Sequence, residues 1–230
     1  MRIPEELLDK FLAAPTASRA RVLVVAVLLA GAAGCLGPGG AASLREQPAA
    51  EAPAQEQALL NSERIEHAFG SYGIDVLASD AATRVSNLYS VEGAEKICRT
   101  FAVTLYPTAV DPRFAEEHAA IAAGGSIGAT FAARGWTVLK ANRYFGEIGA
   151  PARLAELMQI SAGTPLAVHV YVLDVVKDGA RFEYATIAEA HHPQYLTLPD
   201  LPAIYGAAAP LPARPDEPTR RLLERLRSGG

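Results

Sequence analysis

The sequence is poor in several kinds of residue, and each scarcity excludes a class of protein. It has two cysteines among 230 residues, so no disulfide framework can hold the fold together. Aromatic residues make up 7% of the chain, and the net charge is −4 with no Lys/Arg cluster that has interleaved aromatics. Because affinity for nucleic acid depends mainly on basic surfaces, the sequence predicts no nucleic-acid partner.

The chain also lacks an apolar run long enough for a transmembrane helix, which needs about 20 consecutive apolar residues. Its most apolar stretch, VLVVAVLLAGAAGC, runs from Val22 to Cys35. The glycines at its end disfavour a buried core helix, since each costs about 1 kcal/mol inside a helix. Arg19 and Arg21, followed by a short apolar region that ends in small residues, are typical of an export signal. We therefore expect residues 1–34 to be a signal peptide.

The end of this stretch, Ala32-Ala33-Gly34-Cys35, resembles the lipobox of bacterial lipoproteins, which most often has leucine where Ala32 stands. The resemblance implies that Cys35 is acylated, for example with palmitate, and becomes the membrane-anchored first residue of the mature chain. With Leu36 next to the cysteine, it also implies an outer-membrane location facing the periplasm. Two alternatives stay open, namely secretion after cleavage at Ala30-Gly31-Ala32 and an uncleaved or core segment.

Residues 35–58 differ in composition from the rest of the chain. They are rich in Ala, Pro, Gly, Gln and Glu and show no apolar periodicity. Such a segment cannot bury enough apolar surface to fold, so we predict a flexible linker. Residues 59–230 have a globular composition and a length that suits one domain with its own core.

The pattern of this domain predicts an α+β fold, mainly an antiparallel sheet with flanking helices, because strands joined by hairpins are interrupted by helices rather than alternating with them. Strands are expected at 74–78, 83–89, 96–106 and 136–148, and a long hairpin at 165–190 with its turn at Lys177-Asp178-Gly179. Helices are expected from a cap at Asn61 or Ser62, at 112–123, 127–134 and 151–159, and after Asp216. The number of sheets stays open.

The order of elements from Leu154 to Tyr195 carries a second resemblance. A helix, the strand GTPLAVHVYV, a tight turn, a second strand and HHPQYL follow one another. This order resembles the closing half of the chorismate lyase-like ligand-sensing domain of some bacterial regulators. The resemblance implies an antiparallel sheet flanked by helices and a ligand-binding cavity, and it assigns no functional residue.

The stretch GGSIG, from Gly124 to Gly128, matches the G-x-S-x-G pattern of a hydrolase nucleophile, and Ser126, Asp174 and His191 follow in hydrolase order. The pattern requires a buried strand before the serine, because the strand-to-helix turn lifts the hydroxyl above the sheet. The preceding FAEEHAAIAA is helix-like instead. We therefore predict no catalytic residue and keep Ser126, Asp174 and His191 as the alternative.

His169, Glu189 and His191 are the alternative candidates for a metal site. Alternation along a strand places Glu189 and His191 on one face, and pairing of the two hairpin strands decides whether His169 lies near them. A zinc site needs three or four converging ligands with well-placed spacings, and E-x-H-H is a weak signal of that kind. The prediction is that the protein has no metal and no cofactor.

Cys98 is expected to be a small packed residue without a partner if Cys35 is acylated. Ile97, Phe101, Val103 and Leu105 alternate, so Cys98 is predicted on the opposite strand face, with Ala102. If the signal were instead cleaved after Ala32, Cys35 and Cys98 could form a disulfide.

These observations favour a lipid-anchored lipoprotein of the bacterial cell envelope with a non-catalytic binding or assembly domain. Its expected partners are the membrane, through the anchor, and either an envelope protein or a small ligand. The alternative is a small envelope hydrolase that is serine esterase-like or metal-dependent.

Overall fold

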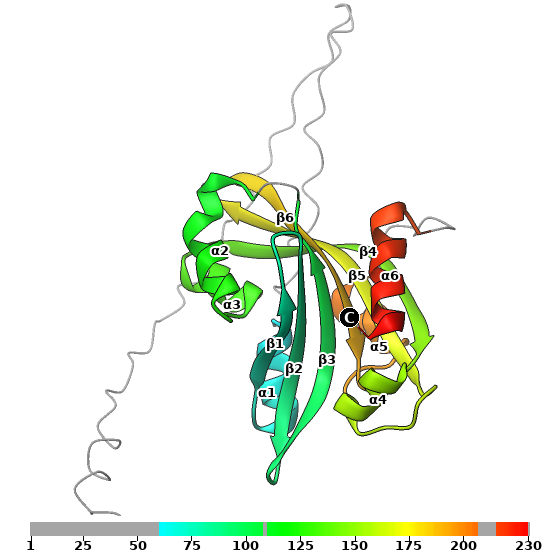
Figure 1. Cartoon of the computed structure of the whole chain (residues 1–230). Helices are drawn as coiled ribbons and strands as arrows, with labels where there is room; N and C mark the ends of the chain where they lie inside the picture. Colours follow the sequence, from blue (N-terminus) through cyan, green and yellow to red (C-terminus); the bar gives the residue numbers. More distant parts are fainter. Residues whose placement is uncertain (1–59, 108–109, 207–214, 230) are drawn as a thin grey trace, which may run out of the picture. The chain divides into compact units, whose positions relative to one another are not determined.

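The computed structural model describes residues 60–107, 110–206 and 215–229. Their strands form one six-stranded sheet of order β1-β2-β3-β6-β5-β4, in which all neighbours are antiparallel (Figure 1). The strands are β1 (Gly73–Ser79), β2 (Thr83–Glu92), β3 (Glu95–Leu105), β4 (Thr137–Gly149), β5 (Pro165–Lys177) and β6 (Ala180–His191). The predicted α+β class is confirmed. The predicted signal peptide, the predicted linker and Cys35 lie outside the described residues.

Helices flank both faces of this sheet (Figure 1). They are α1 (Asn61–Phe69), the 3-10 turn η2 (Pro112–Phe114), α2 (Ala115–Ala122), α3 (Ile127–Ala133), α4 (Ala152–Met158), α5 (Asp200–Tyr205) and α6 (Glu217–Ser228). The chorismate lyase-like resemblance implied an antiparallel sheet flanked by helices, and the structure has both features. The order α4, β5, turn, β6 follows the predicted sequence of elements, and Asp178 and Gly179 turn the hairpin with positive φ angles of 53° and 77°.

One face of the sheet packs against α4 and α6. Their apolar side chains, such as Leu154 and Leu222, are fully buried against Phe101, Val168 and Ala190 of the central strands. Helix α6 starts where the sequence predicts, because the carboxylate of Asp216 accepts a hydrogen bond from the backbone N–H of Thr219 at 2.9 Å. It ends at Gly229, whose φ of 84° glycine adopts without strain.

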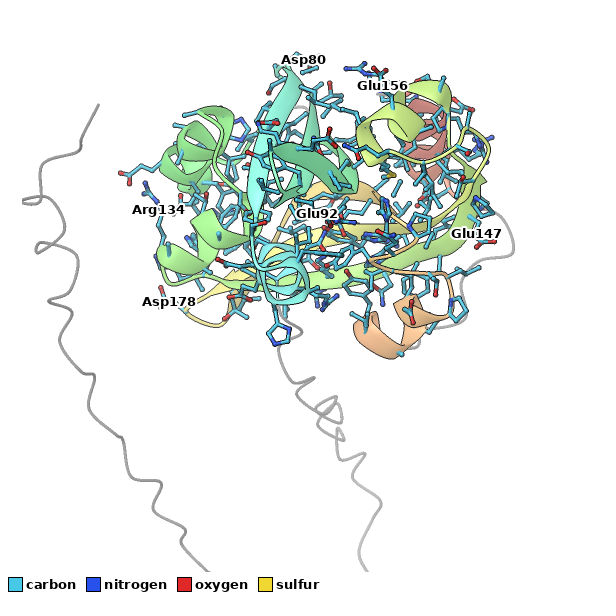
Figure 2. All side chains as sticks on the ribbon, turned by 90° about the horizontal axis from the view of Figure 1, so that it is seen from below. Asp80, Glu92, Arg134, Glu147, Glu156 and Asp178 are labelled. Carbon is cyan, nitrogen blue, oxygen red and sulfur yellow. The ribbon has the colours of Figure 1, made fainter. Side chains whose placement is uncertain are left out.

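The opposite face packs against α1, α2, α3 and α5 in separate clusters. Phe114 and Phe131 join Trp136 and Tyr184 in the largest of them, under η2, α2 and α3. Smaller clusters hold α1 through Ile65 and α5 through Leu201, Tyr205 and their neighbours. Charged side chains such as Asp80, Arg134, Glu147 and Asp178 lie at the rim of the molecule (Figure 2). A cavity with several polar lining residues lies between these clusters.

Two local predictions require correction. Helix α1 is capped by Leu60, so Asn61 is its first helical residue and is free to turn its side chain inward. Helix α5 was not predicted. It is six residues long and contains Pro202, and it is held by the carboxylate of Asp200, which accepts hydrogen bonds from the backbone N–H and the hydroxyl of Thr197.

Cys98 does not lie on the predicted face. The pairing of β2 with β3 shifts between Leu88 and Tyr89, which face Thr100 and Cys98, so Arg99 is an extra residue in β3. The shift turns Cys98 into the cluster of Phe101 and Val103, while Ala102 contacts α1 on the other face. Cys98 is fully buried, and burial raises the pKa of its thiol far above the ordinary value. It is a packed, unreactive residue, as expected from the sequence.

Among the described residues, no helix combines the length and the apolar character needed to cross a membrane.

Candidate functional site

A cavity lies on the face of the sheet that packs against α1, α2, α3 and α5. It is bounded by the sheet, the first turn of α1 and the start of α3. Its volume is about 70 Å³, which is several times the volume that one water molecule needs. Its polar lining residues are Asn61, Ser62, Arg84, Ser86, Thr104, Ser126, Lys140, Tyr171 and Glu189, and the others include Leu88, Val138, Leu173 and Ile187. Apolar walls with a few charged groups are typical of small-molecule sites.

Arg84 of β2 is the most unusual group in this lining. Its side chain is 1% exposed, and its Nη2 donates a hydrogen bond of 2.8 Å to the carbonyl of Gly125. Its Nε has no hydrogen-bond partner, and none of the ion pairs among the described residues includes it. A buried guanidinium is normally paired with an anion, because desolvating a lone charge is costly.

Glu189 of β6 is the carboxylate of the cavity, and it is 4% exposed. It accepts hydrogen bonds from the Tyr171 hydroxyl at 3.0 Å, from Asn61 Nδ2 at 3.3 Å and from Lys140 Nζ at 3.4 Å. Burial by itself raises the pKa of Glu189. The positive charge of Lys140 and the hydrogen bonds from Tyr171 and Lys140 outweigh this effect, so the pKa lies below its ordinary value. Glu189 is ionised at neutral pH.

Lys140 of β4 reaches from the edge strand into the same cavity. Its Nζ lies 4.3 Å from the ring centre of Tyr171 and 4.9 Å from that of Tyr205, and its side chain is 19% exposed. Burial lowers the pKa of the ammonium group, although Glu189 acts in the opposite direction. The two aromatic faces and the carboxylate together fix the position of the amine.

The structure brings together His169, Glu189 and His191, the alternative metal ligands. His169 faces Glu189 directly across the β5–β6 pair. Each group makes a hydrogen bond within the protein, although His169 Nδ1 and His191 Nε2 have no hydrogen-bond partner. His169 Nε2 is 2.8 Å from Asn142 Oδ1, and His191 Nδ1 is 3.0 Å from the Thr100 hydroxyl. No group of three histidine, cysteine or acidic residues in the described part of the chain has an arrangement that could hold a metal ion.

Both histidines are uncharged in the fold. Burial lowers the pKa of His169 well below its ordinary value, and nearby Lys140 acts in the same direction. Burial likewise lowers the pKa of His191 to about 4, with Lys140 adding to the effect and Glu189 opposing it. The histidines therefore belong to a buried polar layer beside the cavity.

The residues of the alternative serine site are separated. Ser126 stands at the N-cap position of α3, without a side-chain capping hydrogen bond, and is preceded by helix α2 and a glycine turn, so no strand leads into it. Asp174 forms an ion pair with Arg181, in which Arg181 Nε donates to Asp174 Oδ2 at 2.8 Å. His191 faces Ala167, seven residues along β5 from Asp174, a separation of about 23 Å at 3.3 Å per residue. Of the three residues, only Ser126 lines the cavity.

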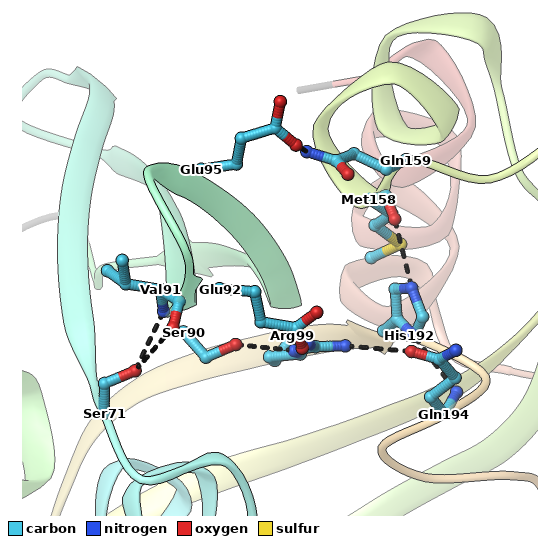
Figure 3. Close-up of polar contacts among 10 residues, drawn as sticks. All are labelled: Ser71, Ser90, Val91, Glu92, Glu95, Arg99, Met158, Gln159, His192 and Gln194. Carbon is cyan, nitrogen blue, oxygen red and sulfur yellow. Dashed lines mark hydrogen bonds and ion pairs between the residues drawn. The ribbon is translucent and has the colours of Figure 1, made fainter.

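A more open groove lies between the β2–β3 hairpin, the end of α4 and the segment after β6 (Figure 3). The buried guanidinium of Arg99 donates hydrogen bonds to the Ser90 hydroxyl at 2.8 Å and to Gln194 Oε1 at 3.3 Å, and it also pairs with Glu92. Across the groove, Gln159 donates to Glu95. These charges are satisfied within the protein, in contrast to Arg84.

Sequence reasoning missed Arg84, Lys140 and Asn61 as site residues. A partial signal for the first two was present, because Arg84 and Lys140 lie within predicted strands. Strand β4 also contains Arg143 and Glu147, however, so charge alone did not single out Lys140. Charged residues at such positions are rarely buried without a partner. Asn61 gave no comparable signal, since an asparagine at the start of a helix is typical of a helix cap.

Comparisons with known proteins give similarity in structure alone. No protein-family model matches the chain, and no curated protein matches it in sequence. The structure is similar to the C-terminal domain of Yurk from Bacillus subtilis, with 18% identity, 55% of this chain and 89% of that chain covered, and a TM-score of 0.31. It is also similar to the C-terminal domain of the histidine utilization repressor from Pseudomonas syringae, with 14% identity, coverage of 55% and 90%, and a TM-score of 0.32.

Proposed function

We propose that this domain binds a small organic acid in the cavity between α1, α3 and the sheet, without converting it. The observation that carries the proposal is Arg84, a buried guanidinium with an unpartnered Nε in the cavity lining. A carboxylate or phosphate group on the ligand would supply the missing anion. Arginine is suited to this role because its planar donors match the geometry of both groups.

The charge balance of the cavity supports the same ligand class. Arg84 and Lys140 contribute two positive charges, and Glu189 is the one acidic side chain among the lining residues. Glu189 already accepts a hydrogen bond from Lys140 at 3.4 Å, which leaves the charge of Arg84 uncompensated. An anionic ligand would therefore bind more tightly than a neutral molecule of the same shape.

We further propose that the protein is a lipid-anchored lipoprotein of the cell envelope, facing the periplasm from the outer membrane. The support is the lipobox-like stretch that ends at Cys35, followed by a linker of Ala, Pro and Gly. In that setting, the domain would sense or hold its ligand in the periplasm, alone or with another envelope protein.

Small acids should raise the melting temperature of the full chain, whereas their amides should not. The measurement is a thermal-shift titration with acetate, pyruvate, benzoate and glycerol phosphate, each beside its neutral amide or alcohol. A ligand at about 100 times its Kd stabilises the fold by about 2.7 kcal/mol. Replacing Arg84 with methionine should weaken the tightest acid by about 100-fold or more, because a buried charge pair is lost.

Arg134→Met, at an exposed arginine outside the cavity, is the matched control and should leave binding unchanged. If Arg84→Met does not fold, Arg84→Lys keeps the charge but lacks the Nε donor and should still weaken binding. The proposal is wrong if acids and amides shift the melting temperature equally, or if Arg84→Met binds acids as the natural chain does.

Expression of the full chain in a Gram-negative host should yield a product that begins at acylated Cys35. The intact mass should show a diacylglyceryl or triacyl group, and Cys35→Ala should lose it. A lipid-free product beginning at Ala33 would contradict the anchor and reopen pairing of Cys35 with Cys98. Neither outcome affects the proposal for the cavity, because Cys35 lies outside the domain that forms it.

A further inference from the structure

Lys140 occupies an unusual place for a lysine. Its amine lines the cavity with Glu189 Oε2 3.4 Å away, and the rings of Tyr171 and Tyr205 lie within 5 Å of it. The side chain is 19% exposed, whereas that of Lys96 is 52% exposed and pairs with Asp75 on the surface. Lys177 is exposed as well. Lys140 is therefore the one lysine in the described part of the chain that a ligand in the cavity would meet.

This arrangement contains what an amine needs to react with a carbonyl group. A lysine becomes nucleophilic when it is desolvated beside another cationic group. Here burial lowers the pKa of Lys140, and the charge of Arg64 adds to the effect. Glu189 is ionised and within reach of the amine, so it can accept the proton that the ammonium group must lose.

We propose that Lys140 forms a reversible imine with an aldehyde or ketone group of the acid bound in the cavity. Glu189 takes one proton from the ammonium group, and the Nζ lone pair attacks the carbonyl carbon to form a C–N bond. The nitrogen, which still carries two protons after the attack, passes one of them to the carbonyl oxygen, and this oxygen becomes a hydroxyl group. The hydroxyl leaves as water with the proton returned from Glu189, and the C=N bond forms. The ammonium group and the carbonyl thus give a protonated imine and water, and no oxidant or reductant is needed.

The inference rests on the proposed function, because it assumes that the ligand is an acid held by Arg84. The cavity limits the size of such a ligand. Arg84 and Lys140 both line it, and its volume is about 70 Å³. A short oxo acid bound there can place its carboxylate at Arg84 and its carbonyl at Lys140.

The test is reductive trapping of the full chain with pyruvate and sodium cyanoborohydride, followed by peptide mapping. Lys140 should be labelled at least about 10-fold faster than Lys96 or Lys177. Lys140→Arg, which keeps the positive charge, should lose this label, and the matched surface variant Lys177→Arg should keep it. Glu189→Gln should slow labelling of Lys140 by about 100-fold, the usual size of a general acid–base contribution.

Arg84→Met and the neutral ketone acetone separate the two proposals. If Arg84 does not hold the acid but Lys140 is reactive, pyruvate and acetone will label Lys140 equally in the natural chain and in Arg84→Met. If pyruvate raises the melting temperature through Arg84 but labels Lys140 no faster than the surface lysines, the imine proposal is wrong and the acid-binding proposal stands. Equal labelling of all lysines likewise overturns the imine proposal.

Discussion

Replacing Phe114 with alanine should lower the free energy of unfolding by about 3–5 kcal/mol, the usual cost of removing a buried phenylalanine side chain. Phe114 is 1% exposed. Its ring makes edge contacts with Phe131, Trp136, Phe182 and Tyr184 at centroid distances of 5.8, 5.4, 6.0 and 5.8 Å. The substitution therefore removes both apolar burial and the favourable geometry of four ring pairs.

Urea denaturation followed by circular dichroism measures this change. Val91→Ala is the control, because Val91 is 44% exposed and its truncation should stay within about 0.5 kcal/mol. A loss below about 1 kcal/mol for Phe114→Ala would contradict the role of the aromatic cluster. Since the same cluster holds α2 and α3 on the sheet, the variant should also weaken acid binding in the cavity beside α3.

Stability should fall as the pH drops from about 6.5 to about 4, and His191 should account for much of the fall. Burial, with Lys140 and Arg64, lowers the pKa of His191 to about 4 against the opposing effect of Glu189. The unfolded chain binds the proton near pH 6.5, so acid favours unfolding throughout this interval. The loss is about 3 kcal/mol, at 1.36 kcal/mol for each pH unit between the two pKa values.

His191→Asn should reduce this slope, because the amide of asparagine can occupy the Nδ1 position opposite the Thr100 hydroxyl but does not titrate. His169 and His192, whose pKa values burial also lowers, act in the same direction, so part of the slope should remain. Val91→Ala, at an exposed position that does not titrate, should leave the profile unchanged. Urea titrations at several pH values measure the effect, and an unchanged slope in His191→Asn would contradict it.

Most elements of the fold were predictable, because local signals define where they begin and end. Asp216, Pro218 and Gly229 mark the two ends of α6, and Asp178-Gly179 marks the turn of the long hairpin. The helix before Ser126 was also predicted correctly. Because the hydrolase pattern requires a strand at that place, this helix argued against a nucleophilic role for Ser126. The short helix α5 was not, since its stability depends on Leu201 and Tyr205 packing on the sheet.

The position of Cys98 shows why the alternation of apolar residues alone did not predict which face of the sheet each side chain occupies. A period of two assigns faces correctly only while pairing is regular, and the extra residue Arg99 shifts every assignment on one side of it. The position of such a bulge depends on how β2 and β3 pair. That pairing is a property of two strands together rather than of either sequence.

The sequence by itself determined the α+β class, the antiparallel hairpins and the limits of most helices, because capping, turn and periodicity signals act within a few residues. Only the tertiary structure determined which residues form the candidate site. Asn61, Arg84, Lys140 and Glu189 come from α1, β2, β4 and β6 and meet in one cavity. The sheet order that brings them together results from packing between distant segments, and so does the burial that leaves Arg84 without an anionic partner.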